Sequence, residues 1–458
     1  MFPRLVAGVW SLRFAMARIG RRYPARLTVG IYALVITVSA TLLMLPAAHA
    51  DGLTTEPMDA IFTATSAVSV TGLATVDTGT HWSFFGQAVI LSSIQIGGFG
   101  VLTLASLLGL LVTKRLSLTT TMLAAAETQT NRFGDLRKII LTVVFVSLGI
   151  ELIIALMLLP RFLEVEDSIG HAVWFSVFYS ISAFNNAGFS PTSAGLTQFA
   201  SDWFVLSPIM LAVIVGGLGF PVILNIARTR WNTKRWSIHT KMTLTVTAFL
   251  LSIGFVWFLA EEWTNPETLG PMPWSEKVLS SLFLSVMPRT AGFNSIDIGA
   301  LSEPSWLMTD ALMFVGGGSA STAGGIKATT LAVLLLAIIA EARGDRDTVS
   351  FHRRIPTDIL RLAIAVTFLS ATIIAMATML LLEITGLTLD VVLFETVSAY
   401  ATVGLSTGIT GGLPESGKAI IVLLMFIGRV GTMTFGAALA MRSGDRLIRL
   451  PEERVIVG

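Results

Sequence analysis

Residues 394–408, FETVSAYATVGLSTG, decide the fold, because a short apolar stretch here runs directly into Thr402, Val403, Gly404 and Leu405. The apolar part is about a dozen residues, whereas a helix that crosses a bilayer needs about 20. Glycine is the residue that most readily adopts strained backbone conformations. The stretch therefore predicts a short helix that does not cross the membrane and that ends in a strained, extended segment.

The same pattern occurs three more times in the chain. It is found at residues 62–79 (FTATSAVSVTGLATVDTG), 178–195 (FYSISAFNNAGFSPTSAG) and 282–299 (LFLSVMPRTAGFNSIDIG). In every copy an apolar residue lies ten positions before a glycine, and Leu or Phe follows that glycine. The glycines are separated by 116, 104 and 112 residues. Such a period is typical of an internally repeated architecture.

The four segments resemble the selectivity filter of potassium channels. A filter replaces the water shell of a cation with backbone carbonyl oxygens. Irregular backbone at membrane depth is tolerated only where it lines a watery cavity, so the segments predict a pore with four filters around one axis. The residues expected to present carbonyls are Val70, Thr71, Gly72, Asn186, Ala187, Gly188, Thr290, Ala291, Gly292, Thr402, Val403 and Gly404.

The composition is that of an integral membrane protein. The 458 residues are 53% hydrophobic and only 13% charged, with a mean hydropathy of +0.76, far from soluble domains. The chain contains no cysteine, which excludes disulfides and thiolate metal sites. Its five histidines are scattered singly, without metal-ligand spacing. No nucleophile with an adjacent base is visible, so we expect no enzymatic activity, and we expect no nucleic-acid partner.

We expect an all-α membrane fold of tandem repeats around one pseudo-fourfold pore. Each repeat consists of a spanning helix, a short re-entrant helix with its filter, and a second spanning helix, which gives 8 transmembrane and 4 re-entrant helices. The predicted parts are a cytoplasmic N-terminal segment 1–26, repeats 27–112, 139–226, 240–340 and 359–441, and a cytoplasmic tail 442–458.

The distribution of basic residues predicts the orientation. Most of the 31 Lys and Arg residues fall between or outside the repeats, whereas the filter-side segments hold only Arg161, Lys277, Arg289 and Lys418. Cytoplasmic loops are enriched in Lys and Arg, so both termini are expected to be cytoplasmic and the filters to face outward.

A run of small residues interrupts the second helix of the third repeat. Ten such residues in a row at mid-membrane depth should break the helix into an intramembrane loop that gates the pore. They are Gly316, Gly317, Gly318, Ser319, Ala320, Ser321, Thr322, Ala323, Gly324 and Gly325. Residues 97–100 and 216–219 are also glycine-rich, and there we expect close packing of helices. The loop 316–325 is not a phosphate-binding loop, because Ile326 precedes Lys327 and Ala328 follows it. No nucleotide site is expected in this chain.

Two basic residues, Lys327 and Arg429, remain inside the membrane segments. An unpaired charge at the bilayer centre costs about 3 kcal/mol, so each should face the pore or a partner. Arg429 is expected to point toward the loop 316–325. Lys327 either does the same or extends to the cytoplasmic surface.

Taken together, the chain is similar to the membrane subunit of bacterial Ktr-type potassium transporters, in the Trk/Ktr/HKT superfamily. The resemblance rests on the four filters, on residues 316–327 (GGGSASTAGGIK), on the helix of Arg429, on 289–294 (RTAGFN) and on 451–454 (PEER). It implies potassium uptake across the bacterial cytoplasmic membrane, homodimerisation and a separate cytosolic ring of nucleotide-binding, RCK-type regulatory subunits. It also implies a gating role for 316–325 and contact between Arg429 and that loop.

The resemblance leaves some alternatives open. A sodium-selective or poorly selective transporter of the same superfamily is the main one, although in this family glycine at the first filter position, Gly72, goes with potassium. Sodium is a possible activator or coupling ion. No helix pair precedes the first repeat and no nucleotide-binding domain follows residue 441, so regulation is expected from another chain.

The segment 341–354, EARGDRDTVSFHRR, is expected to continue the gated helix and to dock on that regulatory ring, since its mixed charges suit a protein contact. Anchoring to anionic membrane lipid is the alternative for this and the other basic loops.

Overall fold

The computed structural model describes residues 24–99, 136–193 and 195–440. Nearly all of the secondary structure in these residues is helical, and the predicted all-α membrane fold is confirmed. The expected terminal segments lie outside the described residues, apart from a few positions. So does the end of the second helix of the first repeat, which was predicted to reach residue 112. The one β-element among the described residues is the hairpin β1 (Val349–Ser350) and β2 (Arg353–Arg354).

The helices follow the order of the predicted repeats. The first repeat has α2 (Pro24–Leu43), α3 (Pro57–Ser69), the short α4 (Thr78–His81) and α5 (Phe84–Gly98). The second has α8 (Leu136–Val165), α9 (Ile169–Phe184), α10 (Trp203–Leu218) and α11 (Phe220–Thr229). The third has α12 (Ile238–Glu261), α13 (Trp274–Val286), α14 (Glu303–Phe314) and α15 (Ala328–Arg343). The fourth has α16 (Thr357–Thr385), α17 (Leu389–Ala401) and α18 (Glu415–Ala440).

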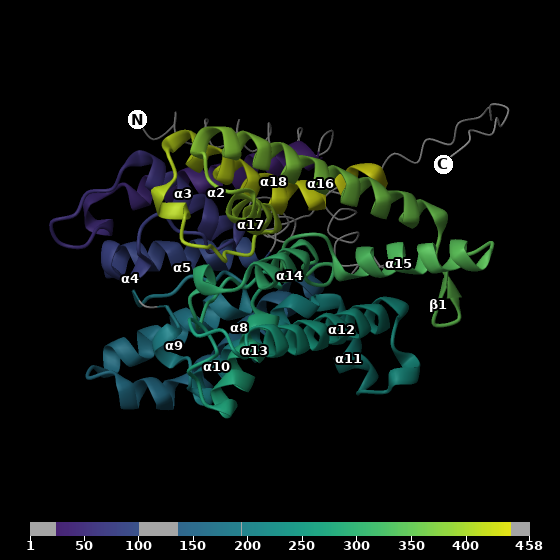
Figure 1. The fold of residues 1–458 in the computed structure, drawn as a ribbon, viewed down its shortest axis with the longest axis horizontal. Helices are drawn as coiled ribbons and strands as arrows, with labels where there is room; N and C mark the ends of the chain where they lie inside the picture. Colours follow the sequence, from purple (N-terminus) through teal and green to yellow (C-terminus); the bar gives the residue numbers. More distant parts are fainter. Residues whose placement is uncertain (1–23, 100–135, 194, 441–458) are drawn as a thin grey trace.

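The repeats pack against one another in cyclic order. Helix α5 contacts α9, α10 contacts α13, α14 contacts α17, and α18 returns to contact α3 and α2. Figure 1 shows the result, with the purple first repeat beside the yellow fourth repeat although they are at opposite ends of the chain. A buried ion pair joins these two repeats, because Lys418 Nζ lies 2.8 Å from Asp59 Oδ1. The first and last repeats therefore close a ring.

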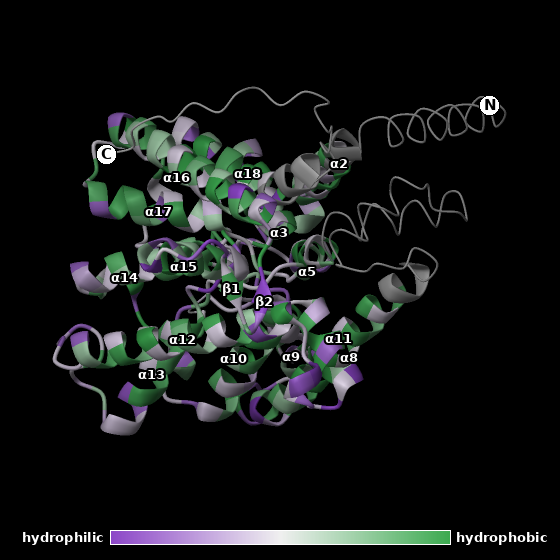
Figure 2. Ribbon diagram, turned by 90° about the vertical axis from the view of Figure 1, so that its right-hand side faces the viewer, coloured by the Kyte–Doolittle hydropathy of each residue, from purple (hydrophilic) through white to green (hydrophobic). Residues whose placement is uncertain are grey.

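Several helices have the length and apolarity of membrane spans. Among the described residues these are Leu141–Val165, Ile238–Glu261 and Thr357–Thr385, with α10 and α11 together as a fourth if that bent pair counts as one span. Green, hydrophobic residues cover most of these helices in Figure 2, whereas purple, hydrophilic residues mark β2. The second expected span of the third repeat is interrupted and forms two helices, α14 and α15.

The second spanning helix of the second repeat was expected to continue unbroken to residue 226, and this prediction was wrong. The helix breaks at Gly219, whose φ is +91°, and α11 leaves α10 at 93°. A left-handed backbone of this kind is cheap only for glycine. The break, together with the missing N–H of Pro221, leaves the carbonyl groups of Gly216 and Gly217 without helical donors, and both bond the loop 316–325.

The expectation that 341–354 continues the gated helix was also wrong. Helix α15 ends at Arg343, and Gly344 caps it in the left-handed conformation with φ +72°. The chain then turns into the β1–β2 hairpin, where Arg354 forms an exposed ion pair of 2.8 Å with Asp347.

Candidate functional site

The four filter segments share one backbone conformation. The residue that follows or closely follows each re-entrant helix is left-handed, and so is the filter glycine two positions later. The φ angles are 57° and 96° at Val70 and Gly72, 60° and 70° at Asn186 and Gly188, 72° and 70° at Thr290 and Gly292, and 51° and 97° at Thr402 and Gly404. For β-branched residues this conformation is a true outlier that costs about 1–3 kcal/mol. The surroundings must therefore hold these segments in place.

Hydrogen bonds to the re-entrant helices hold the filters from behind. In the first repeat the N–H of Thr71 donates to the Ser66 carbonyl at 2.8 Å, and the N–H of Gly72 donates to Ser66 Oγ at 3.0 Å. The N–H and C=O of a trans peptide unit point in opposite directions. Because these N–H groups point back to α3, the carbonyls of Val70 and Thr71 point away from it, toward the centre of the ring.

The fourth repeat has the same bonds. The N–H of Val403 donates to the Ser398 carbonyl at 2.9 Å, and the N–H of Gly404 donates to Ser398 Oγ at 3.1 Å. In the second repeat Ser182 Oγ instead donates to the Phe189 carbonyl at 2.8 Å. Sequence reasoning missed these serines, although a serine six positions before the filter glycine recurs in three repeats. The third repeat has Val286 at that position.

The filter glycines interlock around the ring. A Cβ atom on Gly188 would lie only 2.7 Å from the Ala291 carbonyl oxygen of the next repeat. A Cβ atom on each of the other three would also overlap a carbonyl oxygen of the following filter. Gly72 meets Ala187, Gly292 meets Val403, and Gly404 meets Thr71. The structure thus brings the predicted filter segments together at one place, in the cyclic order of the repeats, and leaves no room for a side chain at these four positions.

The loop 316–325 lies against the first residues of the filters, next to the C-terminal ends of the re-entrant helices. Thr322 Oγ1 lies 3.2 Å from both the Phe184 carbonyl and Asn186 Oδ1 of the second filter. Gly316 lies close to Thr290, and Gly324 is packed so tightly on Thr402 that a Cβ would overlap its side chain. The loop therefore reaches the first residue of three of the four filters.

Backbone bonds to the second repeat fix the loop in this position. The N–H of Gly318 donates to the Gly217 carbonyl at 2.8 Å, and the N–H of Thr322 donates to the Gly216 carbonyl at 3.4 Å. These are the carbonyls left without helical donors by the break at Gly219 and by Pro221. The glycines at 216–219 thus have a second role, beyond close packing, as the docking site of the loop.

Arg429 and Lys327 both bond the loop. Arg429 is 1% exposed, and its guanidinium donates to the Thr322 carbonyl at 2.5 Å and to the Gly97 carbonyl at 3.0 Å. Arg429 thus connects the loop to the first and fourth repeats. Lys327 Nζ donates to the Ala323 carbonyl at 2.7 Å, so its side chain turns back toward the loop rather than toward the cytoplasmic surface.

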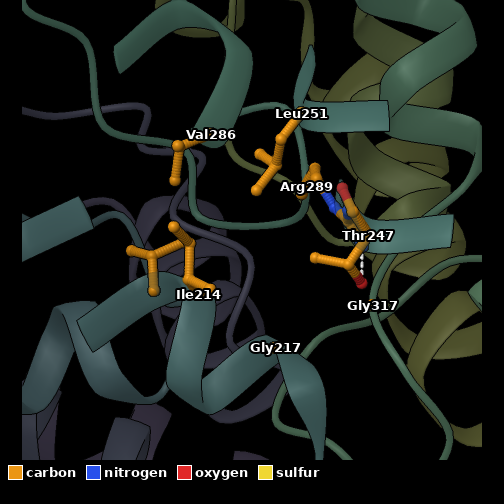
Figure 3. Close-up of a pocket in the computed structure, with 8 residues that line it drawn as sticks. Ile214, Gly217, Thr247, Leu251, Val286, Arg289 and Gly317 are labelled. Carbon is orange, nitrogen blue, oxygen red and sulfur yellow. Dashed lines mark hydrogen bonds between the residues drawn. The ribbon is translucent and has the colours of Figure 1, made fainter. Parts of the chain in front are cut away.

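Arg289 also contacts the loop, which the sequence did not indicate. Sequence reasoning placed Arg289 on the filter side, yet it is 6% exposed and is enclosed within the protein. It donates to the Thr247 carbonyl at 3.2 Å and to the Gly316 carbonyl at 3.3 Å. Figure 3 shows its guanidinium against Thr247, beside a cavity of about 10 Å³, room for about one water molecule. The sequence signal for this location was a basic residue within a membrane segment, with no acidic residue near it in the sequence.

The chemistry of the site is that of neutral oxygen ligands. The described hydrogen bonds use the N–H groups of the filters and leave their carbonyl oxygens without donors. No group of three or more His, Asp or Glu side chains within residues 24–99, 136–193 and 195–440 is arranged to hold a metal ion. A ring of carbonyl dipoles replaces the hydration shell of a cation without a fixed negative charge.

Comparison with known proteins agrees with this geometry. Residues 22–446 match the TrkH family, described as cation transport proteins. The chain is 41% identical to the Ktr system potassium uptake protein B of Bacillus subtilis over 95% of this chain and 96% of that protein. It is 34% identical to the potassium/sodium uptake protein NtpJ of Enterococcus hirae over 96% of this chain and 98% of that protein.

A solved structure shares the fold. The crystal structure of the potassium transporter TrkH from Vibrio parahaemolyticus superimposes with a TM-score of 0.70, covering 92% of this chain and 85% of that one, at 16% identity. The residues that match the family model, 22–446, include all four filters and the loop 316–325. The chain therefore belongs to the TrkH family of cation transport proteins.

Proposed function

We propose that this protein takes up potassium across the bacterial cytoplasmic membrane through the four-filter ring. The observation that carries the proposal is the interlock of Gly72, Gly188, Gly292 and Gly404, each against a carbonyl of the next filter. Oxygen ligands converge there with their N–H groups directed away, which suits a dehydrated monovalent cation. The relatives named as potassium uptake proteins support the same ion. The activity is transport, without a catalytic step.

Sodium enters the proposal in two ways. The relative from Enterococcus hirae is named a potassium/sodium uptake protein, which favours sodium as a coupling or activating ion and keeps a less selective transporter as the second candidate. Gly72 favours potassium as the main ion, because a larger residue at this position would displace the Ala187 carbonyl.

We infer that the loop 316–325 is the gate. It is bonded to the second repeat through Gly216 and Gly217, and to the first and fourth repeats through Arg429. Its side chains are small, so it can leave the filters without displacing a packed core.

The proposed orientation follows from the positive-inside rule. Both termini and the β1–β2 hairpin lie on the cytoplasmic side, and the filters face outward.

The regulatory partner in this proposal is a cytosolic nucleotide-binding ring, with two copies of this chain side by side in the membrane. Helix α15 runs from the loop to Arg343, and residues 344–354, most of them exposed, follow it. The ring would act on this end of α15. The name Ktr system in the Bacillus subtilis relative is consistent with a transporter of more than one component.

Reversing the charges of Arg343, Arg346 and Arg353 together should uncouple flux from nucleotide and leave ion selectivity intact. A full nucleotide response in that triple variant would remove the docking site from the proposal.

The decisive experiment is ion flux into vesicles that contain the purified protein. Uptake of rubidium or potassium should exceed uptake of sodium, and should respond to the regulatory ring and its nucleotide. Vesicles without protein provide the background. Equal uptake of sodium and potassium favours the less selective transporter, and no uptake of either ion above background contradicts the proposal.

A further inference from the structure

A second set of contacts lies behind the filters, on their outer side. Glu395 of α17 is completely buried nine positions before Gly404. Its carboxylate accepts hydrogen bonds from Ser406, at 2.9 Å, and from Thr410. Ser406 lies two positions after the filter glycine, so the bond connects the re-entrant helix with the chain that leaves the filter.

The second repeat has the same arrangement with a different residue. Tyr179, also completely buried and nine positions before Gly188, bonds Ser190 at 2.6 Å through its hydroxyl group. Ser190 again lies two positions after the filter glycine. Thr192 contributes a further bond of 2.8 Å to Tyr179. The Tyr179 ring is stacked on Phe162 at 5.6 Å with an interplanar angle of 2°, which fixes the position of the hydroxyl group.

The serine is turned in the same way in both repeats. The N–H of Thr192 donates to Ser190 Oγ at 3.2 Å, and the N–H of Gly408 donates to Ser406 Oγ at 3.0 Å. Each donor lies four positions after its filter glycine. Two unrelated side chains, a phenol and a carboxyl group, therefore make the same connection to the same backbone position. This correspondence is difficult to attribute to packing alone.

The first and third repeats lack this connection. Thr63 is the equivalent residue of the first repeat, and its hydroxyl group has no hydrogen-bond partner, while Ala74 stands at the serine position. The third repeat has Phe283 and Asn294, and Asn294 bonds the Ile296 carbonyl within its own loop at 3.3 Å. Since the repeats follow one another around the ring, the two connected filters are opposite each other.

We propose that Tyr179 and Glu395 are positioning residues that hold the outer ends of the second and fourth filters and thereby set ion discrimination. Neither residue contacts the ion; each acts through the serine that follows its filter. Where a filter selects by the size of its cavity, discrimination depends on how firmly the carbonyls are held. The second and fourth filters, which are opposite each other, are held by these side chains, and the other two filters adjust to the ion. The inference rests on the proposed potassium uptake.

The test compares Tyr179→Phe and Glu395→Leu with Thr63→Val as the matched control. Tyr179→Phe keeps the stacked ring and removes only the hydroxyl group, and Thr63→Val removes an unpartnered hydroxyl group at the equivalent position. We expect the ratio of sodium to rubidium uptake to rise about threefold to tenfold in Tyr179→Phe, the effect of one or two hydrogen bonds. Glu395→Leu should raise it at least as much, and Glu395→Gln, which can bond both hydroxyl groups, should raise it less.

A comparison of single and double variants distinguishes loss of the specific hydrogen bond from a general effect on packing. Ser190→Ala should raise the ratio by itself, but adding it to Tyr179→Phe should raise the ratio by less than Ser190→Ala does alone, because the bond between the two hydroxyl groups is already lost. If Glu395→Leu does not accumulate in the membrane, Ser406→Ala tests the fourth filter instead. Independent effects of Tyr179→Phe and Ser190→Ala, or ratios no higher than that of Thr63→Val, would overturn the proposal.

A second measurement does not depend on transport. Potassium should raise the melting temperature of the purified parent protein more than sodium does, because a bound ion stabilises the folded state. The two positioning variants should lose much of this difference, whereas Thr63→Val should retain it. A parent protein without the difference would contradict the proposed potassium function. A parent with the difference, and variants that keep it in full, would contradict the role of Tyr179 and Glu395 alone.

Discussion

The filters and the loop 316–325 lie against each other, yet they are held in different ways. Each filter is bonded mainly by its own re-entrant helix, as Thr71 and Gly72 are by Ser66. The loop is bonded within the third repeat and also by other repeats, through Gly217 and Arg429. Bonds within one repeat hold a filter even when the repeats shift relative to one another. Bonds between repeats break together when the repeats or the loop shift, which suits a gate.

The largest effect should come from the filter glycines. Gly72→Ser places a side chain at φ +96° and against the Ala187 carbonyl oxygen. The displaced carbonyl belongs to the next filter, so the substitution distorts the ion site itself as well as straining the backbone by about 1–3 kcal/mol. Since about 1.4 kcal/mol corresponds to a factor of ten, we expect the ratio of sodium to potassium uptake to rise at least about tenfold.

Gly386→Ser is the matched control for this variant. Gly386 also has a positive φ, +64°, but no atom lies within 4 Å of the position where a Cβ would stand. Gly386→Ser has a similar backbone strain but no collision with a carbonyl oxygen, so its ratio of sodium to potassium uptake should match that of the parent. Gly72→Ser with a parental ratio would show that the interlock of the filters does not determine selectivity.

A smaller effect, on gating rather than selectivity, is expected from Arg429→Ala. The variant removes the donors to the Thr322 and Gly97 carbonyls. A hydrogen bond from a charged group contributes about 1.5–3 kcal/mol, so the loop should leave the filters more often. Rubidium flux without the regulatory ring should rise, while the sodium to rubidium ratio stays the same. Flux that is unchanged and fully regulated would mean that Arg429 does not hold the gate.

The filters and the loop 316–325 also differ in how far the sequence predicts them. The filters are local motifs, and the recurrence of an apolar residue ten positions before each glycine was sufficient to find them. The loop 316–325 is visible as ten small residues in a row. Its partners are harder to find, because the carbonyl group of Gly216 becomes available only when the chain turns at Gly219. The carbonyl group of Gly217 lacks a helical donor in any case, because Pro221 has no N–H, and that proline was the available sequence signal. Nothing in the residue types at 216–219 distinguishes such a break from a tightly packed helix.

The burial of Arg289 and the end of α15 illustrate the same limit. Arg289 directly precedes a filter, and in sequence it looks like one of the few basic residues of the outer loops. Its location depends on α12, which supplies Thr247 from about 40 residues away. At the far end of α15, the helix that follows the loop, Gly344 is the cap, with φ +72°. That glycine is a recognisable cap, but a mixed-charge segment equally fits a longer helix.

Gly219→Ala should have a moderate effect on the gate. A Cβ on Gly219 would lie 2.6 Å from the Ser319 carbonyl oxygen, and the residue has φ +91°. Alanine tolerates this backbone poorly, at a cost of about 1 kcal/mol. The loop or α11 must shift, so resting flux should rise by about fivefold, less than in a variant that loses both arginine bonds. Gly217→Ala is a useful comparison, since a Cβ there would meet only Asn186 Nδ2 at 3.5 Å. Equal flux in both variants would argue against docking at the break.

The smallest effect, and the one that locates the hinge of the loop, is expected at Arg289. Its bonds to Thr247 and Gly316 are 3.2–3.3 Å long, and Gly316 is the first residue of the loop. Arg429 bonds Thr322, farther along the loop. If the loop swings about its start, Arg289 holds the fixed end and Arg429 the moving end. Arg289→Gln, which shortens the side chain and loses the charge, should then change resting flux only about twofold, and should instead slow opening and closing together.

Thr247→Val sharpens this comparison because it removes one acceptor of Arg289 and leaves the Thr247 carbonyl in place. Its effect should be smaller than that of Arg289→Gln, and the two together should equal Arg289→Gln alone. Single-channel or stopped-flow flux records give the opening and closing rates separately. If Arg289→Gln raises resting flux as much as Arg429→Ala does, both ends of the loop move, and the gate opens by lifting away from the filters as a unit rather than by swinging about Gly316.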